Sequence, residues 1–258
     1  MKLIQSRDNP FYKELVKLSG SARQRSKANQ TLLDGAHLLA AYLDSGQAPR
    51  HILLNAAALR DEEIAALLKR AGDVPVTQLD DRLFTELSEL KTPTGILALI
   101  DLPQTQPDVA QSRFALLLED IQDPGNLGSM LRSAAAAGCD AVFLSPGCAD
   151  AWSPKVLRAA MGGHFVLQVY ERQDLPEVAQ AFAGALLATS LQATRSLYDC
   201  DLCGNVAFLV GNEGAGLSDN LLNCATYKIT IPMPGKMESL NAAAATAICL
   251  FEAVRQRN

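Results

Sequence analysis

Two apolar segments near the C-terminal end of the chain each end in a loop rich in glycine or proline. Val206–Val210 is followed by Gly211–Gly214, and Tyr227–Ile231 is followed by Pro232–Gly235. The residues Ser239-Leu240-Asn241 then begin a long alanine-rich segment with helical spacing. In an open α/β sheet, ligands bind at the carboxyl ends of the strands, and a helix N-terminus offers free N–H groups. We therefore expect a ligand site in this stretch of the chain.

Strand-like and helix-like segments alternate along the whole chain, which is typical of an α/β fold. The expected strands are 31–33, 51–55, 74–78, 95–100, 114–119, 141–145, 165–170, 185–191, 206–210 and 228–231. The expected helices are 10–18, 35–45, 61–71, 80–89, 126–138, 155–161, 175–184, a turn near 217–223, and 239–255. From residue 114 the strands are near-continuous apolar runs, which predicts a mainly parallel sheet covered on both faces.

Residues 101–113 interrupt this alternation. They hold two prolines and three glutamines and show no apolar periodicity, a composition that is typical of a linker. We therefore expect a small α/β domain at 1–100 and a larger α/β domain at 114–258. A chain of 258 residues is long enough for two ordinary domains.

The composition favours a cytoplasmic protein without a metal site. No apolar run approaches the roughly 18–20 residues of a membrane span, and the N-terminus lacks the apolar core of a signal peptide. The three histidines share no i, i+4 spacing, and Cys200-x-x-Cys203 has no second pair to complete a metal site. The other four cysteines are isolated in or beside apolar segments, where ordinary core thiols are expected. They are Cys139, Cys148, Cys224 and Cys249.

The net charge of −5 argues against a protein that coats nucleic acid with its whole surface, but it permits a local basic patch. Residues 1–33 hold seven lysines and arginines against two acidic residues. This segment is either a solvated helical face or an arm that contacts phosphates, and the segment alone does not favour one over the other. The candidate RNA contacts are Arg7, Lys13, Arg23, Arg25 and Lys27.

The loop after the expected strand 114–119 carries an arginine with small neighbours. The chain turns at Pro124–Gly125 and enters a helix near Asn126, and Arg132 lies less than two helical turns further on. Ser133 and four alanines follow it, so its surroundings are packable and differ from an ordinary solvated face. Arg132 is either part of a structural salt bridge or a cation placed to contact a phosphate or a developing alkoxide.

The two later loops supply further candidates. Three glycines within 211–216 let the backbone approach a ligand closely. Glu213 could accept protons, bind a donor group, or cap the following helix. Ser239 could be a plain N-cap, whereas capping alone does not explain Asn241 in the first turn. The chain has no GxGxxG, P-loop or GxSxG motif, so the standard nucleotide-binding and hydrolase sites are not supported.

Taken together, the three loops closely resemble the motifs of the SpoU/TrmH family of RNA 2′-O-ribose methyltransferases, part of the SPOUT superfamily. The first motif, Asn-x-Gly followed by Arg, matches Asn126, Gly128 and Arg132. The second motif matches Gly211–Leu217 throughout, and the third matches Ile231–Asn241 throughout. Three motifs in order across about 115 residues are far more specific than one. The resemblance covers residues 114–252.

The first domain is similar to the family's accessory substrate-binding domain, which has a ribosomal-protein-like RNA-binding fold. The match rests on Asp34–Leu39 and on Lys91–Ala98, and it is less specific. The chain has Asp34 where the family usually has Glu, and Ala242 where it favours Val. Both changes are small.

The resemblance implies that the C-terminal sheet is tied in a trefoil knot whose loops hold S-adenosylmethionine. It also implies a homodimer, in which the alanine-rich helices that start at Asn126 and Ser239 are the expected packing faces. The cofactor-binding residues implied are Thr189, Ser190, Leu191, Gly211, Asn212, Glu213, Gly214, Ile231, Met233, Ser239 and Leu240.

The resemblance further implies transfer of a methyl group to a ribose 2′-hydroxyl of RNA. We expect Arg132 to act electrostatically, because a guanidinium that stays protonated has no acceptor for a proton. The alternative is that Arg132 acts as the base, with a phosphate or Glu213 relaying the proton. Asn126, Glu213, Ser239 and Asn241 would position the ribose. The accessory domain favours ribosomal RNA as substrate. The alternatives are a tRNA 2′-O-ribose methyltransferase and a non-catalytic RNA-binding or ribosome-assembly protein of the same fold.

Overall fold

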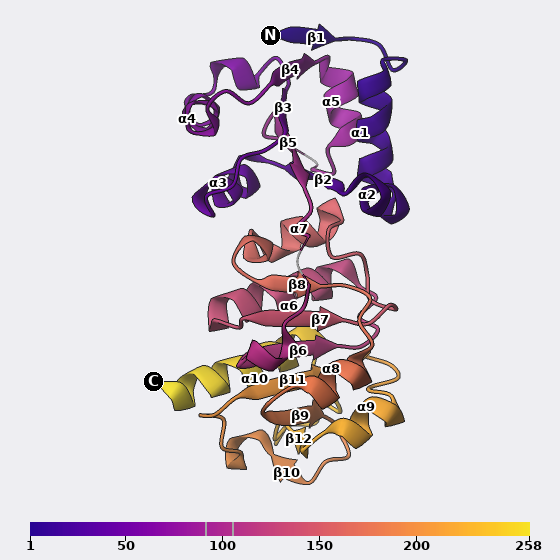
Figure 1. Ribbon diagram of the computed structural model, residues 1–258, viewed down its shortest axis with the longest axis vertical. Helices are drawn as coiled ribbons and strands as arrows, with labels where there is room; N and C mark the ends of the chain where they lie inside the picture. The colour runs from indigo at the N-terminus through magenta and orange to yellow at the C-terminus, as the bar shows by residue number, and fades with distance from the viewer. Residues whose placement is uncertain (91, 105) are drawn as a thin grey trace. The chain divides into compact units, whose positions relative to one another are not determined.

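The computed structural model describes residues 1–90, 92–104 and 106–258 (Figure 1). Lys91 of the first-domain motif and Thr105 of the expected linker lie outside the described residues. The chain forms two compact units. One comprises the described residues up to Gln104 together with Trp152–Phe165, and the other comprises Gln106–Ala151 and Val166–Asn258.

The first unit contains a five-stranded sheet with the order β1-β4-β3-β5-β2. Strands β1, β4 and β3 pair in parallel, whereas β5 is antiparallel to both β3 and β2. The strands are β1 (Lys2–Ile4), β2 (Gln30–Asp34), β3 (His51–Leu54), β4 (Val76–Leu79) and β5 (Ile96–Asp101). The sequence analysis missed β1, because three residues at a chain end give too short a pattern to detect.

Five helices of the first unit cover the two faces of this sheet. They are α1 (Pro10–Gly20), α2 (Ala22–Ala28), α3 (Ala36–Asp44), α4 (Glu62–Ala71) and α5 (Asp81–Leu87). Helices α1 and α5 lie on one side of the strands, and α3 and α4 on the other (Figure 1). Leu53 of β3 belongs to the core cluster under α1 and α5. Its neighbours Ile52 and Leu54 are fully buried too, and since side chains alternate along a strand, they face α3 and α4.

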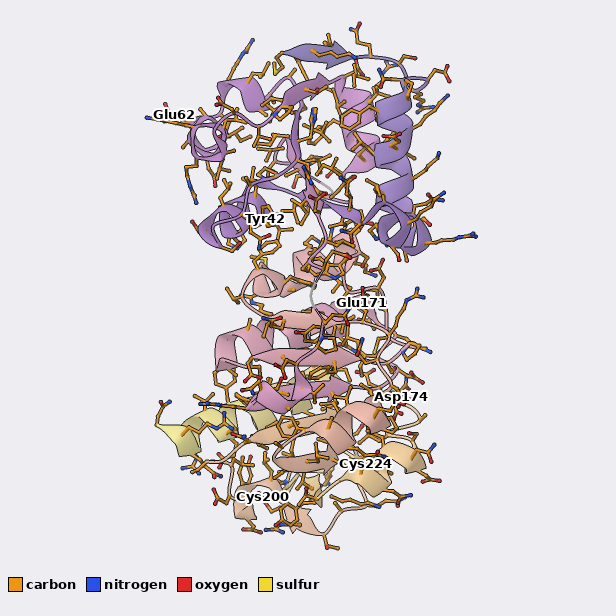
Figure 2. All side chains as sticks on the ribbon, viewed as in Figure 1. Tyr42, Glu62, Glu171, Asp174, Cys200 and Cys224 are labelled. Carbon is orange, nitrogen blue, oxygen red and sulfur yellow. The ribbon has the colours of Figure 1, made fainter. Side chains whose placement is uncertain are left out.

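A segment from the later part of the chain completes the first unit. It contains α7 (Pro154–Ala160) and a short 3-10 turn, Gly163–Phe165. The Thr31 hydroxyl donates a hydrogen bond of 2.7 Å to the carbonyl oxygen of Trp152. The ring of Tyr42, labelled in Figure 2, packs edge-on against the ring of Phe165, and the two ring centroids lie 5.1 Å apart. The segment therefore packs with the first unit, although the sequence analysis counted it in the domain 114–258.

The second unit contains a seven-stranded sheet with the order β10-β12-β9-β11-β6-β7-β8. Every neighbouring pair in it is parallel, as the apolar strand runs predicted. The strands are β6 (Phe114–Leu118), β7 (Ala141–Leu144), β8 (Gln168–Tyr170), β9 (Ala185–Thr189), β10 (Arg195–Ser196), β11 (Val206–Val210) and β12 (Tyr227–Thr230). The expected strand 165–170 is shorter than predicted because Phe165 packs against Tyr42 instead of joining the sheet.

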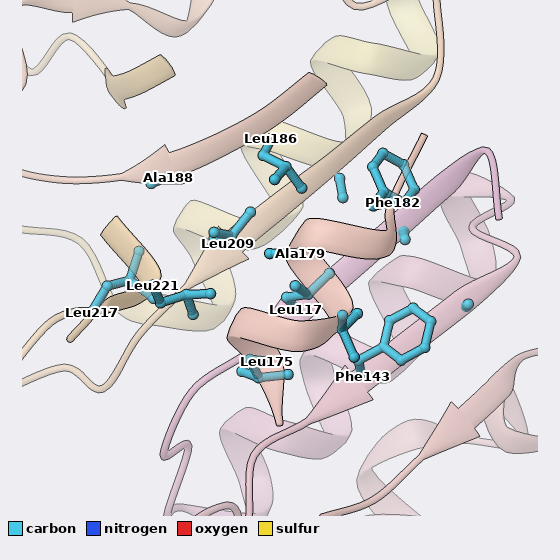
Figure 3. Packing of buried hydrophobic residues seen from close by; sticks show 14 of the residues in the cluster. Leu117, Phe143, Leu175, Ala179, Phe182, Leu186, Ala188, Leu209, Leu217 and Leu221 are labelled. Carbon is cyan, nitrogen blue, oxygen red and sulfur yellow. The ribbon is translucent and has the colours of Figure 1, made fainter. Parts of the chain in front are cut away.

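Helices cover both faces of this second sheet. Helices α8 (Leu175–Ala181) and α9 (Asp219–Cys224) pack on one face, where α8 covers Leu117, Phe143 and Leu209 (Figure 3). Helices α6 (Pro124–Ala137) and α10 (Ala242–Arg257) pack against each other, and α10 also contacts β11. Gly138 ends α6 in the left-handed conformation with φ 77°, as the sequence predicted.

The long C-terminal helix starts three residues later than the sequence analysis expected. Asn241 is its N-cap, and the side-chain oxygen accepts hydrogen bonds from the backbone N–H groups of Ala243 (3.0 Å) and Ala244 (3.2 Å). The prediction that Ser239 opens the helix was therefore wrong. Ser239 lies in an exposed loop ahead of the helix, because the amide of Asn241 satisfies the first N–H groups itself.

The cysteines are all free and lie in both buried and exposed positions. Burial raises the pKa of the Cys139 thiol, and it raises the pKa of Cys249 to about 12. These two residues are therefore neutral core thiols. In the described part of the chain, no helix is both long enough and apolar enough to cross a membrane.

We predict that Arg25→Ala destabilises the first unit. The Arg25 side chain is buried and donates hydrogen bonds to the carbonyl oxygens of Leu18 (2.6 Å) and Ser19 (2.9 Å), where α1 ends. Losing these charged donors should cost about 2–3 kcal/mol. Trp152, the chain's one tryptophan, belongs to this unit, so its fluorescence during urea unfolding reports the change.

The control is Arg23→Ala, which removes an exposed side chain from the same helix and should change stability by less than about 0.5 kcal/mol. Equal unfolding midpoints for the two variants would contradict a structural role for Arg25.

Candidate functional site

The three motif loops meet at one edge of the second sheet. They follow β6, β11 and β12, and a fourth loop follows β9, which lies between β11 and β12. Because these strands are parallel, their carboxyl ends lie at the same edge of the sheet. Residues separated by more than 100 positions in the sequence are thereby brought together.

Side chains from all three loops form a closed hydrogen-bonded cluster. The Asn126 amide donates to Glu213 Oε1 at 2.8 Å. The Asn241 amide donates both to Glu213 Oε1 (2.9 Å) and to Asn126 Oδ1 (3.0 Å). A third donor to Glu213 Oε1, the backbone N–H of Ala242, reaches it at 3.2 Å. One carboxylate oxygen therefore joins the three motifs.

Of the three roles that the sequence left open for Glu213, capping of the following helix is not the one observed. The helix that follows it, α9, is capped by Ser218, whose hydroxyl accepts from the N–H of Leu221 at 3.3 Å. Glu213 instead accepts from the first residue of α10. Within the described part of the chain, Glu213 Oε2 receives no hydrogen bond, so that oxygen is available to a ligand.

The glycine-rich loop is folded tightly on itself. A Cβ atom on Gly211 would overlap the carbonyl oxygen of Gly216, so glycine is required at position 211. Asn212 Oδ1 accepts from the N–H groups of Gly214 (2.8 Å) and Ala215 (3.2 Å). The Asn212 amide also donates to the carbonyl oxygen of Asp120 at 3.0 Å. The loop after β11 is thus fixed internally and held to the loop after β6.

A second connection between these two loops was missed by sequence reasoning. Both carboxylate oxygens of Glu119 are used by Ser218, whose N–H donates to one at 2.6 Å and whose hydroxyl donates to the other at 2.7 Å. A carboxylate at the start of α9 also interacts favourably with the helix dipole. The signal available in the sequence was weak: Ser218 is a plausible N-cap, but nothing identifies Glu119 as its partner.

Asp120 is a strained residue beside this connection. It adopts a left-handed backbone with φ 54°, which is uncommon for a residue other than glycine. Its carboxylate accepts from the Ser145 hydroxyl at 2.7 Å, and its N–H donates back to Ser145 Oγ at 2.9 Å. A Cβ atom on Gly147 would overlap this carboxylate. The loop after β7 therefore helps to hold the first motif loop in place.

A pocket of about 400 Å³ opens among these loops, within the usual range of about 300–1,000 Å³ for ligand sites. All eleven residues that the sequence analysis assigned to the cofactor lie along it. The lining residues include apolar side chains on two loops, Leu191, Ile231, Met233 and Leu240. Among the described residues that line the pocket, Glu213 has the one ionisable side chain.

Arg132 is placed differently from the other expected catalytic residues. It is exposed on α6 and does not line the pocket. Among the described residues it forms no ion pair and no hydrogen bond, so the structural salt bridge weighed from the sequence is absent. Asn126 and Asn241 belong to the hydrogen-bonded cluster, and Ser239 lines the pocket. The structure therefore brings four of the five expected catalytic residues together and leaves Arg132 free.

The five basic residues expected to contact RNA fall into three groups. Arg7 pairs with Glu86, and Lys13 pairs with Asp8 at 2.8 Å. Arg25 is buried and bound to backbone carbonyl groups. Arg23 and Lys27 are exposed on α2, and no ion pair engages them within the described residues. The described residues also contain no group of three or more metal-ligating side chains.

We predict that Gly211→Ala lowers the thermal stability of the second unit. The added methyl group would overlap backbone atoms of Gly216, which cannot move aside without opening the loop. A cost of about 2–3 kcal/mol corresponds to a fall in Tm of roughly 5–10 °C, measured by circular dichroism.

The matched control is Gly214→Ala in the same loop. Its added methyl group would meet Asn212 Oδ1 at an ordinary contact distance of 3.4 Å. A Tm within about 2 °C of the parent protein is expected for a change of this size. If both variants melted with the parent, the described loop conformation would be wrong.

Comparison with known proteins agrees with the motif assignment. A family model described as "SpoU rRNA Methylase family" matches residues 113–251, and an "MRM3-like substrate binding domain" matches residues 9–98. An uncharacterised tRNA/rRNA methyltransferase of Synechocystis is 34% identical over 98% of this chain and 94% of its own length. The 23S rRNA (guanosine(2553)-2′-O)-methyltransferase RlmP of Bacillus subtilis is 35% identical over 97% of this chain and 98% of its own.

A solved structure shows the same architecture with a cofactor. The SpoU methyltransferase AviRb of Streptomyces viridochromogenes, in complex with AdoMet, superposes with a TM-score of 0.86 and 29% identity. The match covers 96% of this chain and 98% of AviRb. The family match spans more than half of the chain, and similar proteins extend over nearly all of it. The chain belongs to the SpoU rRNA methylase family.

Proposed function

We propose that this protein transfers the methyl group of S-adenosylmethionine to the 2′-hydroxyl of a ribose in ribosomal RNA. The observation that carries the proposal is the cluster of Asn126, Glu213 and Asn241 beside a pocket of ligand size. Family membership supports the reaction. The 23S rRNA specificity of the similar Bacillus enzyme supports the substrate.

The pocket has the features that this cofactor needs. Glycines at 211, 214 and 216 let the backbone approach the ligand, and the four apolar side chains along the pocket form a surface on which adenine can stack. The AdoMet complex of the similar AviRb enzyme supports this assignment. When bound, the cofactor supplies an electrophilic methyl group, and the protein supplies orientation and electrostatics.

The expected catalytic residues have distinct roles in this proposal. The Asn126 amide donates one N–H to Glu213, and its second N–H is available to the ribose. The Ser239 hydroxyl at the pocket wall is a further group available to the ribose. Arg132, free of protein partners among the described residues, binds the 2′-oxygen or the adjacent phosphate. A guanidinium stays charged, so it stabilises the developing alkoxide rather than accepting the proton.

The remaining expectations concern assembly, topology and RNA binding. Helices α6 and α10 form the proposed homodimer face, where Phe251 is 47% exposed and Ile248 is half-buried. The trefoil knot and a cytoplasmic location are part of the proposal, and family membership supports both. In the first unit, Arg23 and Lys27 are the basic residues on α2 that are available to RNA phosphates.

We predict that the purified protein methylates unmodified ribosomal RNA when supplied with radiolabelled S-adenosylmethionine. The modified ribose should then resist alkaline cleavage, because its 2′-oxygen is blocked. Unmodified tRNA serves as the second substrate. Label in tRNA alone would support the same reaction with tRNA as the substrate. Binding of cofactor and RNA without methyl transfer to free or particle-bound RNA would favour the non-catalytic alternative.

We further predict that Arg132→Ala lowers kcat by about 10²–10³-fold, the usual effect of losing a donor to a developing oxyanion. The affinity of this variant for S-adenosylmethionine should change by less than about threefold, because Arg132 does not line the pocket. Ser129→Ala, an exposed change on the same helix, is the control. Near-normal turnover by Arg132→Ala would exclude this role.

A further inference from the structure

The cofactor pocket has one formal charge on its wall. The described residues that line it are apolar or neutral, apart from Glu213. The third motif loop, Ile231–Asn241, also carries Lys236 and Glu238. These two residues are exposed, opposite in charge and not part of the pocket lining. A ligand in the pocket therefore meets one carboxylate among the described lining residues.

This carboxylate is held without being neutralised. Its three hydrogen-bond donors, the amides of Asn126 and Asn241 and the backbone N–H of Ala242, are all uncharged. All three act on Oε1, and no described residue donates to Oε2. No lysine or arginine in the described part of the chain forms an ion pair with Glu213. The carboxylate therefore has no cationic partner among the described residues and can attract a cationic ligand.

S-adenosylmethionine and its product, S-adenosylhomocysteine, differ in a way that such a charge can detect. The substrate has a methyl group and a positive charge on sulfur, whereas the product sulfur is neutral. The adenosine, amino and carboxylate groups are common to both. A carboxylate on the pocket wall therefore attracts the substrate more than the product, and its effect on the shared groups cancels in the ratio of the two affinities.

We propose that Glu213 makes the pocket selective for the sulfonium cofactor over its neutral product, and so promotes product release after each transfer. The inference rests on the proposed function and concerns the same pocket. As the 2′-oxygen bonds to the methyl carbon, the carbon–sulfur bond breaks and its electron pair returns to sulfur. The hydroxyl proton passes to solvent. The charge that Glu213 attracts is lost in the same step.

The test measures ligand binding to the full-length protein without RNA, so that no turnover occurs. Isothermal titration calorimetry is run with S-adenosylmethionine, S-adenosylhomocysteine and sinefungin, which has a positively charged amine near the sulfonium position and cannot transfer a methyl group. The variant is Glu213→Gln, which keeps the side-chain shape and one oxygen that can accept from the same three donors. Glu238→Gln, on the same loop but outside the pocket lining, is the matched control.

In Glu213→Gln, the Kd values for S-adenosylmethionine and sinefungin should rise about tenfold, equivalent to about 1.4 kcal/mol. The Kd of this variant for S-adenosylhomocysteine should change by less than about twofold. Glu238→Gln should leave the Kd values for all three ligands near those of the parent protein. Equal weakening of the three ligands would show that Glu213 only holds the loops together, and unchanged affinities would show that its charge is not felt. Either result overturns the inference.

The parent protein alone provides a second measurement, which does not depend on the variant folding. Its Kd for S-adenosylhomocysteine should exceed that for sinefungin by about tenfold, and equal values would overturn the inference while leaving the proposed function intact. A parent protein that binds none of the three ligands would remove the proposed function itself, and the inference with it.

Discussion

The arrangement of the site depends on three hydrogen bonds that converge on one oxygen atom, Oε1 of Glu213. The donors come from the first motif (Asn126), from the third motif (Asn241), and from the N-terminal turn of α10 (Ala242). Through them, one carboxylate oxygen of the second motif is bound to both of the other motif loops. A carboxylate is suited to this position because it accepts several donors at once, and because the N-terminus of a helix stabilises a negative charge. The hydrogen-bonded cluster therefore determines both the start of α10 and the shape of the pocket wall.

Around this cluster, further contacts fix the backbone of the loops. Ser218 donates twice to Glu119, and Asn212 closes the glycine-rich loop while donating to Asp120. Gly211 is required because a Cβ atom there would meet the backbone of Gly216. These contacts join the loops after β6 and β11, which are neighbouring strands in the sheet. Hydrogen bonds of this kind restrict the loop before any ligand arrives, and a pre-organised loop loses less conformational entropy on binding.

The sequence predicted those features that depend on local pattern. The buried parallel strands β6 and β11 followed from continuous apolar runs, and the end of α6 followed from Gly138. Features that depend on tertiary contacts escaped it. The segment Trp152–Phe165, which contains α7, packs with the first unit through partners such as Thr31 and Tyr42, more than 100 positions earlier. The N-cap of α10 is Asn241 rather than Ser239, and the Asn241 amide also donates to Asn126 across 115 positions. Glu119 has no local signal, and Arg25 has the same sequence signal as Arg23 although one is buried and the other exposed.

The identity of the donors to Glu213 has a functional consequence. An arginine or lysine could join the loops as firmly, since hydrogen bonds to charged groups are stronger than those between neutral ones. A cation would, however, cancel the negative charge at the pocket wall. Two asparagines and a backbone N–H hold the carboxylate in place and leave its charge in effect. The chain thereby gives up the stronger bond and keeps a field that distinguishes a cationic ligand from a neutral one. On this argument, neutral amides at 126 and 241 are required by the charge of the ligand as much as by the geometry of the loops.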